Sequence, residues 1–180
     1  MQARGLLMIE HRLIERMLSV IGDALSEIES RHVVDPVFVD IAVDFIKVYA
    51  DRTHHGKEED ILFKELDQKP LSAEDRKVMA ELIQEHLFGR RTTQALVAAN
   101  ARYRQGDTGA WAEIADHLKT LIEFYPRHIE KEDKQFFPAA RSYFSQSEDQ
   151  AVLARFNAFD QRMIHEKYGT VVAGLEKAKG

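Results

Sequence analysis

The amino-acid sequence contains one segment twice, at a separation of 74 residues. Residues 54–63, HHGKEEDILF, align with residues 128–137, HIEKEDKQFF, so that a histidine, a lysine, two acids and an aromatic residue recur at matching places. Upstream, the dipeptide Glu-His at residues 10–11 recurs at residues 85–86, at a separation of 75 residues. Because the two separations are nearly equal, we infer that the chain is built from two copies of one helical hairpin.

Apolar residues at helical spacing predict five helices in this chain. The expected ranges are 3–30, 35–66, 72–104, 108–144 and 147–177. Asp35 followed by Pro36 is typical of a helix start, and Ser72 with Asp75 three residues later resembles a capping box. The 9 glycines and 4 prolines are too few for a turn-rich all-β fold.

Long helices with short connections pack most readily as an up-down-up-down four-helix bundle. We therefore predict an all-α fold with such a bundle in residues 1–145. Residues 146–180 are expected to form an additional C-terminal helix, docked on the bundle within the same domain.

The composition limits the chemistry that this chain can perform. Its 180 residues include no cysteine, which excludes disulfides, thiolate zinc sites, iron–sulfur clusters and thiol nucleophiles. A metal ion would therefore need His, Asp and Glu ligands. The formal net charge of −5 argues against a nucleic-acid partner. No stretch approaches the roughly 20 apolar residues of a membrane span, so we expect no membrane partner and a cytoplasmic location.

The repeated histidines and acids form a candidate metal site. His54 and Glu58 are four residues apart, as are His128 and Glu132, so each pair lies on one face of its helix. Such pairs are commonly solvated, but the repeat places both at one depth and adds one histidine from each of the other two helices. Bundle cores hold di-iron sites built from such ligands. The predicted metal ligands are His11, His54, Glu58, His86, His128 and Glu132.

The charge of this ligand set favours two metal ions. The two carboxylates supply a charge of −2, whereas two divalent irons supply +4. A bridging oxide or hydroxide would therefore bring the site nearer to neutrality. Burying the same groups without a metal would be costly. We therefore expect two iron ions with a bridging oxide or hydroxide, with other divalent metals as alternatives.

The order His, His-x-x-x-Glu, His, His-x-x-x-Glu over about residues 8–140 resembles the hemerythrin-like (HHE cation-binding) proteins. The resemblance implies a four-helix bundle around a di-iron centre that binds oxygen, nitric oxide or oxidants. It further implies that His11 and His54 serve one iron, that His86 and His128 serve the other, and that Glu58 and Glu132 bridge them.

Three features depart from the family pattern. Arg90 stands four residues after His86, where the oxygen carriers place a fifth histidine, which argues against reversible oxygen carriage. Asp133 stands five residues after His128, where the carriers use an acid, so Glu132 and Asp133 are alternatives for the bridging role. Members proposed to repair iron–sulfur clusters commonly carry an additional cysteine-containing segment, and the absence of cysteine here weakens that role.

Some neighbouring residues are alternative ligands. The candidates are Glu15, His55, Asp133 and His165. His55 rivals His54, because it pairs with Glu59 at the same spacing. Glu15 either forms an ion pair with Arg90 beside the metals or binds iron itself. His165 would supply a fifth imidazole if the last helix crossed the metal end.

Tyr125 lies one turn before His128. It fits either an ordinary core position or a hydrogen-bonding role toward a metal-bound species.

Several functions are compatible with such a centre. The first is a binding or sensing protein for oxygen, nitric oxide or a related oxidant. The second is an enzyme that reduces peroxide, oxygen or nitric oxide with electrons from an outside donor. The third is the storage or donation of iron, and the fourth is a metal-free bundle used for protein contacts. The sequence contains no reductase domain or flavin motif, so it favours binding over catalysis, and no catalytic residue is predicted.

Overall fold

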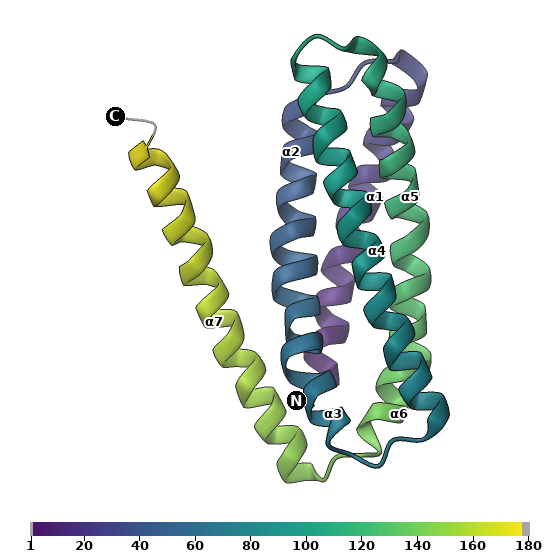
Figure 1. Ribbon diagram of the computed structural model, residues 1–180, viewed down its shortest axis with the longest axis vertical. Helices are drawn as coiled ribbons and strands as arrows, with labels where there is room; N and C mark the ends of the chain where they lie inside the picture. The colour runs from purple at the N-terminus through teal and green to yellow at the C-terminus, as the bar shows by residue number, and fades with distance from the viewer. Residues whose placement is uncertain (1, 178–180) are drawn as a thin grey trace.

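The computed structural model describes the backbone of residues 2–177 and the side chains of residues 2–165 and 167. Within these residues the chain consists of helices and short connections, without strands, which confirms the all-α prediction. Four long rods lie side by side in Figure 1, and successive rods are joined at opposite ends of the molecule.

Each rod is made of one or more helical segments. The first rod is α1 (Ala3–Arg31), and the third is α4 (Ala73–Arg104). The second combines α2 (Pro36–Asp44), η1 (Phe45–His55), η2 (Glu58–Leu62) and α3 (Phe63–Asp67). The fourth combines η3 (Thr108–Ala110), α5 (Trp111–Lys131), η4 (Glu132–Phe136) and α6 (Phe137–Arg141), and α7 (Gln146–Lys177) follows.

Two of these helices begin as the sequence predicts. The Asp35 carboxylate accepts hydrogen bonds from the backbone N–H groups of Val37 and Phe38, ahead of Pro36 in the first turn of α2. The Ser72 hydroxyl accepts the backbone N–H of Asp75 at 3.0 Å and so caps α4. These bonds satisfy N–H groups that a helix start leaves without partners.

Segments η1, η2 and η4 are π-helical, with hydrogen bonds to the fifth rather than the fourth preceding residue. Segments η2 and η4 start at Glu58 and Glu132, so the sequence repeat extends to the backbone conformation. Segment η1 has no counterpart in the second repeat, where α5 is a regular helix. Wide π turns of this kind are frequent at functional sites.

The apolar core is divided into two clusters. One packs Leu18, Ile21, Leu96 and Leu118 near one end of the bundle. The other, which includes Leu7, lies toward the opposite end and incorporates α7. A polar level separates the two clusters along the rods, and it contains residues 10–11, 54–58, 86 and 128–132.

Helix α7 packs against the bundle through its first half. Phe156 and Phe159 are buried in the second cluster. Toward its C-terminal end, α7 leans away from the four rods in Figure 1. No helix among the described residues has an apolar stretch long enough to cross a membrane.

Candidate metal centre

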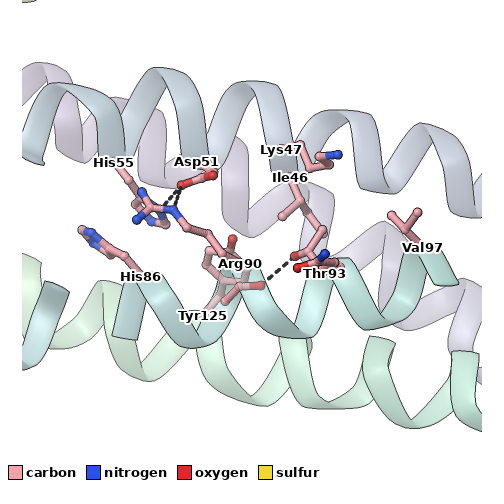
Figure 2. A pocket seen from close by; sticks show the side chains of 11 residues that line it. Ile46, Lys47, Asp51, His55, His86, Arg90, Thr93, Val97 and Tyr125 are labelled. Atoms are coloured by element: carbon pink, nitrogen blue, oxygen red, sulfur yellow. Dashed lines mark hydrogen bonds and ion pairs between the residues drawn. The ribbon is translucent and has the colours of Figure 1, made fainter. Parts of the chain in front are cut away.

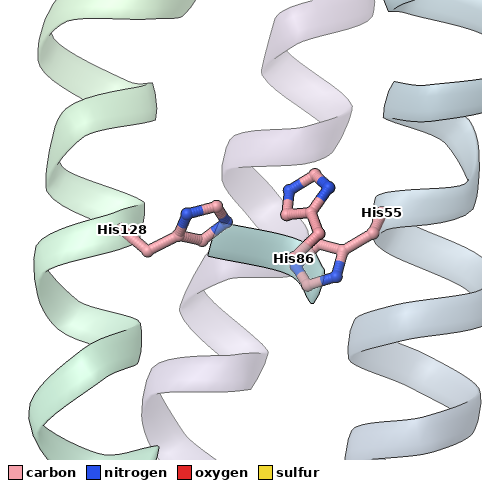
Figure 3. A group of neighbouring side chains, drawn as sticks. All are labelled: His55, His86 and His128. Atoms are coloured by element: carbon pink, nitrogen blue, oxygen red, sulfur yellow. The ribbon is translucent and has the colours of Figure 1, made fainter. Parts of the chain in front are cut away.

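Buried side chains from all four rods meet at the polar level. One group consists of His11, His54, Glu58 and Glu132, and another consists of His55, His86 and His128. Within each group the potential ligand atoms lie within 4.8 Å of one another. None of these residues is more than 2% exposed. Figure 3 shows the three imidazoles of the second group, which come from three different rods.

All six of the main predicted ligands lie in these two groups, and His55 joins them. The sequence treats His54 and His55 as rivals, but the structure buries both rings. Both belong to the π-helical segment η1, which turns less per residue than an α-helix, so two consecutive side chains can face the interior. The ring of His55 stacks on that of His86, with centroids 3.9 Å apart and planes 12° apart.

Glu58 and Glu132 each lie between the histidines of the first group, His11 and His54, and those of the second. The Glu58 Oε1 atom lies 3.6 Å from His54 Nε2, while its Oε2 atom lies 3.4 Å from His86 Nε2. The Glu132 Oε2 atom lies 3.2 Å from His11 Nε2, while its Oε1 atom lies 3.4 Å from His128 Nε2. None of these four carboxylate oxygens has a hydrogen-bond partner among the described residues. Each carboxylate thus turns one unpaired oxygen toward each histidine group.

Four of the five imidazoles are held by carboxylates outside the two groups. The Nδ1 atoms of the histidines lie within hydrogen-bond distance of these acids: His11–Asp133 at 2.7 Å, His54–Glu10 at 2.9 Å, His86–Glu59 at 2.6 Å and His128–Glu85 at 2.8 Å. A carboxylate accepts the Nδ1–H proton, so the Nε2 lone pair of each ring is directed into the site. Such outer carboxylates orient metal-bound histidines and increase their basicity.

We call Glu10, Glu59, Glu85 and Asp133 the carboxylate collar. The sequence identified none of them as a positioning group, although all four belong to the repeat. Lysines at matching positions extend the pattern, because Lys57 binds Glu10 and Lys131 binds Glu85. The recurrence of Glu before His and of an acid after the bridging Glu was the signal that could have identified the collar.

The fifth imidazole, His55, is held less tightly. Its Nδ1 atom lies 3.5 Å from Asp51 and has no hydrogen bond among the described residues. In the second repeat the equivalent position is Ile129, so His55 makes the two histidine groups unequal.

Burial and neighbouring charges change the protonation of the site. Burial, and then the charge of Glu132, raise the pKa of Glu58 well above its usual range. Burial lowers the pKa of His54 to about 4, although Glu10 opposes the shift. Burial also opposes the charged form of His11, but the carboxylates of Asp133 and Glu132 outweigh it and raise the pKa to about 9.

These residues fit metal cations. The Nε2 atoms of His11 and His54 lie 2.9 Å apart, so a protonated His11 donates to His54, and a metal cation that displaces this proton could bind both lone pairs. The oxygens of Glu58 and Glu132 have no hydrogen-bond partner among the described residues, and burying them without a partner or a cation would be costly. Imidazole with carboxylate is a donor set suited to iron, zinc or manganese.

Comparison with protein-family models matches residues 3–140 to the hemerythrin HHE cation-binding domain. The chain belongs to the hemerythrin HHE cation-binding family. The searches of curated proteins and of solved structures gave no match. As a hemerythrin-like domain, this chain is a metal-binding protein whose buried His and Glu groups can hold the cation.

Three residues expected as ligands, or as partners beside the metals, have other roles in this hemerythrin-like domain. The predicted Glu15–Arg90 ion pair is wrong, because Glu15 pairs with Arg12 at 3.1 Å, while Arg90 binds Asp51 at 2.7 Å and Glu59 at 2.9 Å. The helical phase of α1 directs Glu15 outward, which also places it outside both groups.

Two of the alternative ligands also lie outside both groups. Asp133 belongs to the collar and holds His11, so it is Glu132 that faces the interior. The side chain of His165 is exposed on α7, because this helix packs alongside the bundle rather than across the metal level.

Proposed function

We propose that this hemerythrin-like domain holds two iron ions joined by an oxide or hydroxide and captures or senses oxygen, nitric oxide or a related oxidant. His11 and His54 would hold the first iron. His86 and His128, together with His55, would hold the second. Glu58 and Glu132 would bridge the two ions. The observation that supports two ions rather than one is that each buried carboxylate directs one unpaired oxygen to each histidine group.

The bound irons would supply positions where a small molecule can coordinate and exchange electrons. The protein would contribute a buried setting that excludes water and a rigid ligand frame. The collar carboxylates hold Nδ1 of four rings, so these imidazoles would direct Nε2 toward the metal. With two imidazoles on one iron and three on the other, the first iron would have the greater number of positions left for an outside ligand.

We favour binding over turnover because the sequence contains no flavin motif and no cysteine that could relay electrons to the centre. A reducing enzyme of this type would also need an outside electron donor.

The proposal is tested by the iron content per chain and the near-ultraviolet and visible spectrum of protein purified without chelator. We expect about two irons and charge-transfer bands that change on exposure to oxygen, nitric oxide or azide. Glu132→Gln should reduce the iron content, whereas Glu130→Gln, which changes an exposed glutamate on the same rod, should not. Failure to take up iron under anaerobic loading would refute the di-iron centre, and a loaded centre whose spectrum ignores all three molecules would refute the binding role.

A further inference from the structure

A cavity of about 370 Å³ lies beside the second histidine group. It runs between η1 and α4, and Figure 2 shows His55 and His86 at one end and Val97 toward the other. One water molecule occupies roughly 30 Å³ in the liquid, and oxygen or nitric oxide is of similar size. The cavity is therefore far larger than a diatomic ligand needs, and its volume falls in the range of sites for small organic molecules.

The end of the cavity near the metal level is polar and carries the hydroxyl of Tyr125. Tyr125 is only 2% exposed and lines the cavity, and its hydroxyl, which makes no hydrogen bond to a described residue, reaches the cavity space. A hydroxyl in this position can donate a hydrogen bond to a ligand. An oxygen atom of a ligand in the cavity would supply the acceptor.

Arg90 adds hydrogen-bond donors to the same end, and its charge is balanced by Asp51, which also lines the cavity, and by Glu59. Its Nε atom binds Asp51 and its Nη2 atom binds Glu59, which fixes the guanidinium in place. The Nη1 atom makes no hydrogen bond to a described residue, and arginine carries donors only. Among the charged side chains that line the cavity, Lys47 and Arg90 outnumber Asp51, so the guanidinium donors beside the Tyr125 hydroxyl suit an acceptor-rich, negatively charged head group.

The rest of the cavity is suited to a short apolar chain. Ile46 and Val97 line it on opposite rods. Gly89 leaves space beside the Tyr125 hydroxyl, which an added Cβ atom would approach to 3.9 Å. Lys47 lies at the rim and adds a second positive charge.

We propose that this cavity binds a small aliphatic carboxylate, with its head group at Tyr125 and Arg90 and its chain along Ile46 and Val97. The proposal rests on the proposed function to the extent that the head group would lie next to the second iron. Occupancy of the cavity would then modulate the centre, because His55 and His86 form part of the cavity wall.

The test is calorimetric titration of the iron-loaded protein with acetate, butyrate and hexanoate, with the iron spectrum recorded on the same samples. We expect hexanoate to bind more tightly than acetate and to perturb the spectrum. Tyr125→Phe should weaken hexanoate binding roughly tenfold through loss of one hydrogen bond to a charged group, with iron content unchanged. Arg91→Gln, an exposed neighbour of Arg90, is the matched control and should leave binding unchanged.

A second variant examines the chain-binding part. Val97→Phe should weaken hexanoate but spare acetate, because the added ring would shorten the cavity without touching the polar end. Two irons per chain with no carboxylate binding, or equal affinity of Tyr125→Phe and wild type, would overturn the proposal and leave the di-iron centre intact. Hexanoate binding without iron uptake would uphold the cavity and refute the centre.

Discussion

The buried ammonium group of Lys57 lies 2.6 Å from the Asp160 carboxylate of α7 and also binds Glu10 of the collar. Lys57 has no exposed surface, so both acids are needed to compensate its charge. Since Glu10 holds Nδ1 of His54, a chain of polar contacts leads from the metal level to α7. The last helix is therefore connected to the candidate site although none of its described side chains lies in either ligand group.

Asp160→Asn should destabilise the protein because it removes one of the two charges that compensate Lys57. Leaving a buried charged group underpaired costs roughly 1–3 kcal/mol, which should be visible in urea unfolding. Asp44→Asn is the control, since it breaks the exposed Lys167–Asp44 pair between α7 and the same rod and should change stability little. Equal effects of the two substitutions would contradict this account of Lys57.

Gly56 is required for the packing of α7. A Cβ atom added to it would lie 2.8 Å from the Phe159 ring, closer than real contacts allow. Gly56→Ala should therefore lower the free energy of unfolding by roughly 1–3 kcal/mol, because the buried ring would have to move. Gly22→Ala should instead raise it by up to about 1 kcal/mol, since its Cβ would meet open space within a helix. Thermal unfolding of both variants would show opposite shifts if the packing is as described.

Asp133→Asn should weaken metal binding without removing a ligand. The carboxylate orients His11 from outside the site, and loss of such an outer partner typically costs about 10–100-fold in metal affinity. Competition with a chelator measures this affinity. Glu27→Gln changes an exposed acid on the same helix as His11 that is paired with Arg31, and its affinity should match that of the wild type. A similar loss in Glu27→Gln would argue against a specific role of the collar.

His55→Ala should affect the two metal positions unequally. We expect one ion to remain tightly bound and the second to become easily removed, because the substitution takes an imidazole from only one histidine group. His165→Ala is the control, since that histidine is exposed on α7. Stepwise removal of metal by a chelator would distinguish the positions, and simultaneous loss of both ions would contradict the assignment.

Metal uptake should release protons near neutral pH. The acids Asp133 and Glu132 raise the pKa of His11 to about 9 in the metal-free protein despite the opposing effect of burial, so below that pH the ring carries a proton that a metal must displace. Metal affinity should consequently increase as the pH rises toward 9. Calorimetry in buffers of different ionisation enthalpy would detect the released protons. An affinity independent of pH between 6.5 and 8.5 would contradict a protonated His11.

Helices, caps and the main ligands were accessible from the sequence because they depend on local spacing. Asp35 and Ser72 signal helix starts through bonds made within a few residues. His54 with Glu58, and His128 with Glu132, occupy one helical face by spacing alone, and the repeat brings the two halves together.

Other features depend on contacts that no local pattern specifies. Whether His54 or His55 faces inward was decided by the π-helical segment η1, which has no counterpart in the second repeat and buries both. The partner of Arg90 was decided by how α4 packs against the second rod, which brings Asp51 and Glu59 within reach and leaves Glu15 to Arg12. Local sequence determines which face of a helix a residue occupies, whereas the rotation and packing of whole helices determine which residue it meets there.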